Sequence, residues 1–193
     1  MDNRGYTLSE IIVVVSIIGI ISTAGFWMYN GMFERANAAE IATDLQTIRS
    51  AWKLYLLDTN SISPLQGAFG AGNPDAPCHS EPPLINTDLF TNVTGNANWS
   101  GPYLPTEPLD PWNRRYTYDN DNDNYSYAPP TIQAGVNIQI QWCPGQSEEQ
   151  TRYVKIAPLI DDILDNGDGP NAGTFRWNPA NNGGYFYLLA PGR

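Results

Sequence analysis

Hydrophobic and polar positions give the first part of the chain a character of its own. The nineteen residues 11–29 carry no charged side chain and are rich in isoleucine and valine. A helix of that length is about 28 Å long, close to the hydrocarbon thickness of a bilayer. We therefore expect a hydrophobic helix that spans a membrane. The short segment MDNRG precedes it, and its single arginine favours a cytoplasmic N-terminus.

The helical pattern continues beyond the apolar run. Apolar residues recur at spacings of three and four, which is typical of one stripe of an amphipathic helix. Gly25 and Gly31 lie between the two halves, where glycine lets a helix bend. The sequence DTNSISP predicts the end of the helix near Asp58. The stripe consists of Ala38, Ile41, Leu45, Ile48, Trp52 and Tyr55.

Loops and short strands are predicted for the rest of the chain. Residues 61–97 are rich in Gly, Pro, Asn and Ser and predict a long loop or small subdomain. Period-two alternation then predicts an antiparallel sheet within residues 98–193, against which the helix packs in an α+β fold. The predicted elements are strands at 114–118, 124–128, 136–142 and 151–157, a short helix from about 158, and a hairpin of 174–177 with 185–190.

The net charge of the chain argues against one class of binding partner. Twenty acidic and ten basic residues give a net charge of −10. Such a chain repels phosphate backbones, so we expect no direct contact with nucleic acid. The same composition suits an extracytoplasmic surface and oxygen-seeking cations such as calcium.

The two cysteines, Cys78 and Cys143, fit neither a zinc spacing nor a C-x-x-C motif. Beyond a membrane-entry segment they meet an oxidising compartment, which favours one disulfide; two free buried thiols are the alternative. His79 is the only histidine, and no nucleophile–His–acid set, P-loop or dinucleotide fingerprint is present. We therefore expect no enzyme activity.

Two acidic segments are candidate calcium sites. In DNGDGPNAG, the side chains of Asp165, Asp168 and Asn171 could supply oxygen ligands, or the segment could be a helix stop followed by an Asx-rich turn. In DNDNDN, acids alternate as at the start of an EF-hand loop. The sixth and twelfth positions are Asn124 and Pro130 instead of Gly and Glu, which excludes a full EF-hand and favours a solvated hairpin turn. The acids of DNDNDN are Asp119, Asp121 and Asp123.

The stretch RGYTLSEIIVVVSIIGI resembles the start of a type IV pilin-like precursor. The resemblance implies the pilin fold, with a leader of residues 1–5, a hydrophobic membrane-spanning and filament-core helix of residues 6–30, and a globular head of residues 31–193. It also implies cleavage after Gly5 by a prepilin peptidase and an N-methylated Tyr6. It also places Glu10 at the acidic fifth position of the mature chain. The chain departs from the family pattern at Tyr6, where Phe is more usual, and at Ser9, where an aliphatic residue is common. The proline often found along this helix is absent.

Glu10 has an expected role in this resemblance. Cleavage creates an α-amine on Tyr6, and a buried carboxylate is costly unless it meets such a charge. In a filament of bundled helices, Glu10 would pair with the amine of a neighbouring copy and so select the axial register. The alternative is that Glu10 only lies at the cytoplasmic lipid interface.

The segment GPYLPTEPLDPWNRRYTYD is similar to a pattern in the major pseudopilin of type II secretion systems, and KLYLLDTN is similar to its helix end. The resemblance implies a structural subunit of a periplasmic filament that drives protein export. Its partners would be copies of itself, minor pilin-like subunits, the prepilin peptidase, an inner-membrane assembly platform and lipid. The resemblance also implies a calcium-binding loop in the part of the chain that contains DNGDGPNAG, although the family's loop has a different sequence.

Two other functions stay open. A type IV pilus subunit would form a surface fibre for adhesion, motility or DNA uptake, and the large head with its expected disulfide favours it. A secreted binding module would begin with an ordinary signal peptide, because Ser22-Thr23-Ala24 imitates a cleavage site that would free Gly25. Helical periodicity that continues past Ala24 argues against the module. As a filament subunit, the precursor is a single-pass inner-membrane protein, later periplasmic or at the cell surface.

Overall fold

The structure is a computed structural model that divides into two compact units, residues 1–36 and 37–193. The boundary falls within the long helix α1 (Leu8–Thr59), and each unit is described by itself. The described residues are 6–61, 77–78, 81–120, 135–180 and 183–191, without the side chains of 24–30.

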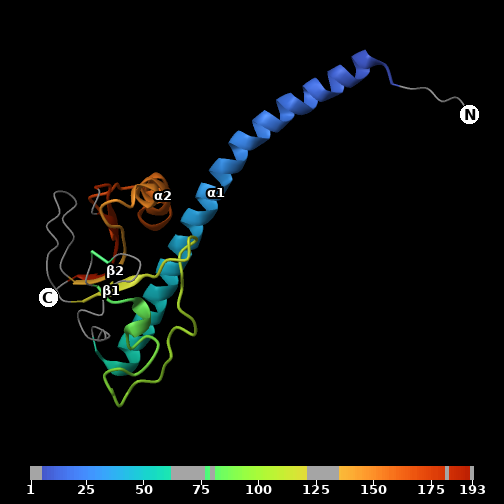
Figure 1. Cartoon of the computed structure of the whole chain (residues 1–193). Helices are drawn as coiled ribbons and strands as arrows, with labels where there is room; N and C mark the ends of the chain where they lie inside the picture. Colours follow the sequence, from blue (N-terminus) through green and yellow to red (C-terminus); the bar gives the residue numbers. More distant parts are fainter. Residues whose placement is uncertain (1–5, 62–76, 79–80, 121–134, 181–182, 192–193) are drawn as a thin grey trace, which may run out of the picture. The chain divides into compact units, whose positions relative to one another are not determined.

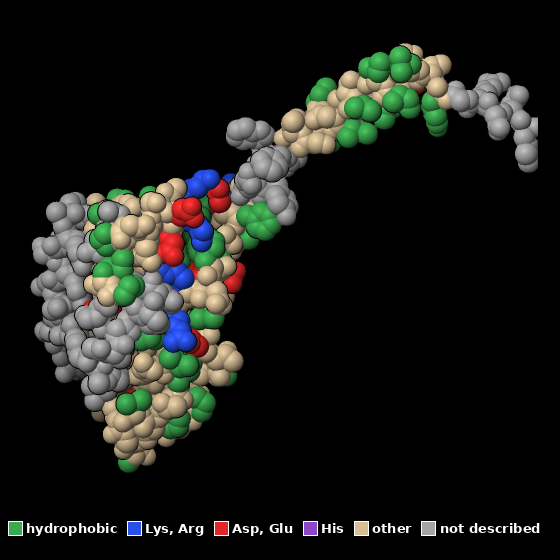
Figure 2. All heavy atoms as spheres, viewed as in Figure 1, with side chains coloured by type: hydrophobic (Ala, Val, Ile, Leu, Met, Phe, Trp, Pro, Cys, Tyr) green, Lys and Arg blue, Asp and Glu red, His purple; other side chains and the backbone are tan. Residues whose placement is uncertain are grey.

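The first unit is a helical rod. The large apolar side chains described in this unit are exposed, from 48% at Ile11 to 85% at Tyr6, and they stand out as hydrophobic surface in Figure 2. Such a surface needs cover from outside the chain. In the part of the chain that the structure describes, no helix is both long and apolar enough to cross a membrane. The span expected over residues 6–30 includes side chains that are not described, and it stays a prediction.

The second unit, residues 37–193, is called the head below, and it begins with the amphipathic half of α1. The predicted apolar stripe is buried: Ala38, Ile41 and Ile48 have no exposed surface, and Tyr55 is 1% exposed. The helix ends at Thr59, one residue after the expected end. Asn60 then adopts a left-handed conformation at φ 52°, which asparagine tolerates, and its N–H donates to the carbonyl of Leu56.

A four-stranded antiparallel sheet packs on this half of α1, which confirms the α+β fold. The strands are β1 (Thr117–Asp119), β2 (Gly135–Gln141), β3 (Phe175–Asn178) and β4 (Gly184–Pro191) (Figure 1). Their spatial order is β1-β2-β4-β3. Ile138 on β2 pairs with Tyr118 on β1 and with Tyr187 on β4, so these buried side chains share the core face. Side chains of α1 reach the sheet directly, since Arg49 donates to the Tyr187 hydroxyl at 2.9 Å.

Helix α2 (Ser147–Asp165) corrects two expectations. The strand predicted at 151–157 is wrong, and the helix begins at Ser147 instead of near 158. The buried residues Tyr153, Ile156 and Ile160 follow helical spacing across Pro158. Pro158 does not end the helix; its side chain is exposed. The strand expected at 124–128 lies outside the described residues.

Part of the segment 61–97 belongs to the sheet region. Tyr118 donates its N–H to the carbonyl of Pro82 at 3.1 Å, and Leu84 donates to the carbonyl of Tyr116 at 2.8 Å. These bonds place residues 82–84 along the outer edge of β1, ahead of the 3₁₀ helix η1 (Leu84–Asn86). This part of the predicted loop therefore covers a strand edge that would otherwise be open.

Candidate functional site

The rod begins with a capping box. Thr7 precedes the first helical residue, and its backbone N–H and its hydroxyl both donate to the Glu10 carboxylate at 2.8 Å. The Glu10 N–H lies 3.4 Å from the Thr7 hydroxyl oxygen. Reciprocal bonds of this kind satisfy groups that a helix start leaves without partners. The Glu10 side chain is therefore directed toward the chain's own N-terminus.

The expected processing residues lie next to this box. Tyr6 is 85% exposed, and Gly5 lies outside the described residues. The processing role of Gly5 and Tyr6 and the assembly role of Glu10 remain predictions.

Three carboxylates gather where α2 ends. One oxygen each of Asp161, Asp165 and Asp168 lies within 4.8 Å of the others. Sequence analysis named Asp165 and Asp168 but missed Asp161, whose position four residues before Asp165 puts both on one helix face. Asn171, which it named instead, is exposed in the same loop.

Asp161 is the most buried member of this acidic cluster, at 2% exposure. Its Oδ2 accepts the Gly169 N–H at 2.9 Å, and among the described residues its buried Oδ1 has no hydrogen-bond partner. Burial raises the pKa of Asp161, and the carboxylates of Asp168 and Asp165 raise it further. A nearby positive charge would stabilise the ionised form of a buried carboxyl group that has other carboxylates around it.

Asp165 shapes the space beside the cluster. Its carboxylate accepts the N–H and hydroxyl of Thr174, both at 2.9 Å, which fixes the start of β3. Gly173 has φ +65°, and a Cβ built there would lie 2.6 Å from Asp165 Oδ2 and 2.7 Å from Asp168 Oδ2. Glycine thus keeps open a space lined by oxygen atoms. These donors fit a hard cation.

The second acidic segment is only partly described. Asp119 ends β1, is buried, and accepts a 2.8 Å hydrogen bond from the Gln139 amide. Asp121 and Asp123 lie outside the described residues. The choice between a hairpin turn and a calcium site is therefore not tested there.

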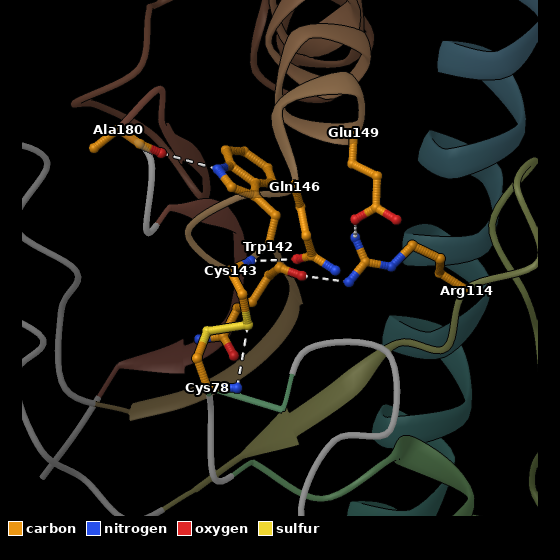
Figure 3. The surroundings of a disulfide bond; sticks show 8 residues. Cys78, Arg114, Trp142, Cys143, Gln146, Glu149 and Ala180 are labelled. Carbon is orange, nitrogen blue, oxygen red and sulfur yellow. Dashed lines mark hydrogen bonds and ion pairs between the residues drawn. A yellow bond between two sulfur atoms is a disulfide. The ribbon is translucent and has the colours of Figure 1, made fainter.

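The predicted disulfide between Cys78 and Cys143 is present (Figure 3). Cys78 also donates its N–H to Cys143 Sγ at 3.1 Å. Cys143 follows β2, and its N–H donates to the side chain of Gln146 just before α2. The bond therefore joins the segment that leads to the β1 edge with the junction of β2 and α2.

The motif Asp110-Pro111-Trp112 (DPW) anchors α2 to the sheet region, a role that was not predicted from the sequence. Asp110 Oδ1 accepts the N–H groups of Trp112 at 3.0 Å and Arg114 at 2.7 Å, and its Oδ2 accepts the Tyr153 hydroxyl of α2. Burial raises the pKa of Asp110. Arg114 pairs with Glu149 at 2.7 Å (Figure 3). The motif is a structural element here.

Comparisons with known proteins agree on one family. The model described as type II secretion system (T2SS), protein G matches residues 85–137, and the prokaryotic N-terminal methylation motif matches residues 1–26. The type II secretion system core protein G of Escherichia coli (strain K12) is 30% identical over 124 residues, which are 64% of this chain and 77% of that protein. No solved structure matches the chain significantly.

Two further relatives show the range of similarity. The core protein G of Vibrio cholerae is 29% identical over 114 residues, 59% of this chain and 68% of that protein. The type IV narrow pilus major component of Thermus thermophilus is 26% identical over 98 residues, 51% of this chain and 83% of that protein. Together with the methylation motif and the α+β fold, these matches confirm the resemblance: the chain belongs to the protein G family of type II secretion systems, the major pseudopilins.

Proposed function

We propose that the chain is a structural, non-catalytic subunit that polymerises into a periplasmic filament for protein export. A prepilin peptidase cuts after Gly5 and methylates Tyr6, so the precursor is held in the inner membrane by residues 6–30 with its N-terminus in the cytoplasm. The observation that carries the proposal is the position of Glu10, an acid directed at the N-terminus of a rod with exposed apolar side chains.

Assembly then changes what covers the apolar side chains of the rod. In the polymer, rods of neighbouring copies cover the apolar side chains that lipid covers in the precursor. The carboxylate of Glu10 meets the Tyr6 amine of an adjacent copy, and a misaligned copy would leave two buried charges unpaired. The attraction therefore selects one register among the many that apolar contact alone permits.

The test replaces Glu10 with alanine. We expect Glu10→Ala to insert into membranes and to reduce filament yield at least tenfold, because the pairing charge is gone. Quantifying sheared filaments against the membrane-bound pool measures both. The control Glu40→Ala removes an exposed acid from the same helix and should leave the yield within twofold. A normal yield from Glu10→Ala would refute the pairing.

Mass spectrometry of the mature N-terminus distinguishes the filament subunit from the alternative of a secreted binding module. A methylated Tyr6 supports the filament subunit, whereas a free Gly25 supports a secreted module with a signal peptide. Similarity to a pilus component of Thermus thermophilus keeps a surface fibre as the second candidate. Locating the filament by immunolabelling, in the periplasm or outside the cell, distinguishes these two.

We also propose that the acidic cluster of Asp161, Asp165 and Asp168 holds calcium in the head. Two ligand oxygens on opposite sides of a calcium ion are about 4.8 Å apart, since each lies 2.3–2.6 Å from the metal. One oxygen of each cluster member lies within 4.8 Å of the others, so all three can contact one ion, and Asp161 brings an oxygen without a hydrogen-bond partner among the described residues. The ion would link the end of α2 to the loop before β3.

Calcium should therefore stabilise the head. At a concentration a hundred times its Kd the gain is about 2.7 kcal/mol, which corresponds to a rise in Tm of roughly 5–10 °C. Thermal unfolding with calcium and with a chelator measures this rise. Asp161→Asn should abolish it, and Asp162→Asn, a change at the exposed neighbour, should keep it. An equal rise in both variants would contradict the site.

A further inference from the structure

The disulfide encloses the residues that carry the family match. The matched residues are 85–137, Cys78 lies before them and Cys143 lies after them. The bond thus joins the two segments that flank the matched core. Neither cysteine belongs to the matched residues, so the family match does not account for the bond.

Residues that follow Cys78 complete the sheet. Glu81, Pro82, Pro83 and Leu84 are buried, and the main chain of 82–84 bonds to both sides of Thr117 on β1. Release of this segment would open the outer edge of β1. An open strand edge pairs readily with other chains, so a head without the bond is prone to wrong association.

The two sulfurs differ in access. Cys78 is exposed, whereas Cys143 is 8% exposed. Thiol–disulfide exchange requires an accessible sulfur, so an oxidant reaches the pair through Cys78. The described cysteines are the only two in the chain, which leaves one possible intramolecular bond.

We propose that oxidation of Cys78 and Cys143 by an extracytoplasmic dithiol–disulfide oxidoreductase is a required step before the chain enters the filament. The Cys78 thiolate attacks the disulfide of that enzyme and forms a mixed disulfide. The Cys143 thiolate then attacks Cys78 Sγ, which closes the bond and releases the enzyme as a dithiol. Two electrons and two protons pass from the chain to the enzyme. This step rests on the proposed filament function.

The test uses the full chain in cells that assemble it, grown with increasing dithiothreitol in the medium. Sheared filaments and the membrane-bound pool are treated with a maleimide–polyethylene glycol reagent, which shifts the band of every chain with free thiols. We expect reduced chains to be at least tenfold rarer in filaments than in the membrane pool. Equal fractions in both would overturn the proposal.

A double variant gives an independent measurement. Cys78→Ser with Cys143→Ser should keep N-terminal processing, measured by mass spectrometry, and lower filament yield at least tenfold. A normal yield overturns the oxidation step alone. A wild-type chain that is processed but forms no filaments under oxidising conditions contradicts the filament function as well, so the two failures are distinguishable.

Discussion

Asp44 shows how one residue links helix and sheet. It lies on the amphipathic half of α1, and its carboxylate accepts the Tyr116 hydroxyl at 2.9 Å. Burial raises the pKa of Asp44, the hydrogen bond from Tyr116 opposes that shift, and the nearby acids Glu40 and Asp110 add to it. The folded head therefore binds the Asp44 proton more tightly than the unfolded chain does.

The sign of the pH dependence follows from this shift. Stability from a raised carboxyl pKa is present at low pH and is lost as pH rises through the folded-state pKa. Asp44→Asn keeps an oxygen atom that accepts the hydrogen bond of the Tyr116 hydroxyl. Because an amide does not ionise, the variant avoids the loss of stability at higher pH. We expect the variant to gain about 0.5 kcal/mol at pH 7, after solvent screening, and nothing at pH 3.

Urea unfolding of the full chain in detergent at the two pH values measures the gain. Glu148→Gln changes an exposed acid on α2 that does not contribute to the Asp44 shift and is the control, for which no gain at pH 7 is expected. A gain of equal size at pH 3 and pH 7 would show that the charge of Asp44 is not its cause.

At the scale of elements, α2 and the loop before β3 form the calcium candidate together. Asp161 and Asp165 come from the last turns of the helix, Asp168 from the loop, and Gly173 leaves the space between two of the carboxylates. The helix has no basic residue in its last turn, so its negative pole adds to the negative potential at the cluster.

Two glycine variants distinguish steric blocking of the proposed calcium site from backbone strain caused by a side chain at positive φ. Gly173→Ala puts a Cβ against the Asp165 and Asp168 oxygens, so calcium affinity should fall at least tenfold. Gly169→Ala is the matched control: it also has a positive φ, at +98°, but its Cβ would meet nothing within 4 Å. Both should lose about 1 kcal/mol of stability. Calorimetric titration measures the affinities, and equal weakening in both would argue against a site beside Gly173.

At the scale of the whole molecule, rod and head obey different requirements. Among the side chains that the structure describes, the buried hydrophobic ones all come from Ala38 onward, whereas exposed apolar side chains crowd the region from Tyr6 to Ile21. The head buries its own hydrophobic core, whereas the exposed apolar side chains of the rod need cover from outside the chain. On the face shown in Figure 2, acidic and basic side chains gather on the head.

This division predicts that residues 37–193 fold without the rod. The fragment should be a soluble monomer with a cooperative thermal transition, because the division into compact units leaves the core intact. The full chain should need detergent or form polymers. Analytical ultracentrifugation and calorimetry check both statements. A fragment that aggregates or lacks a transition would show that the rod contributes to the core.

Local sequence patterns were enough to predict the features that repeat along the chain or depend on near neighbours. The apolar rod, the stripe from Ala38 to Tyr55 and the alternating strand β2 were all predicted, because helices and strands impose fixed periods on burial. The processing motif was recognisable for the same local reason. The disulfide was expected from an oxidising compartment, and having only two cysteines fixed which residues pair.

Features that depend on contacts between distant residues could be seen only in the folded chain. The alternating residues 151–157 are compatible with a strand, and packing of Tyr153 against Asp110 and the sheet makes them helix. Asp161 and Asp165 both lie in the helix that was predicted from about 158, but the acidic cluster also needs the loop after α2 to bring Asp168 to them. Residues 82–84 likewise lie along β1 through main-chain bonds to residues more than thirty positions away, which no local pattern reports.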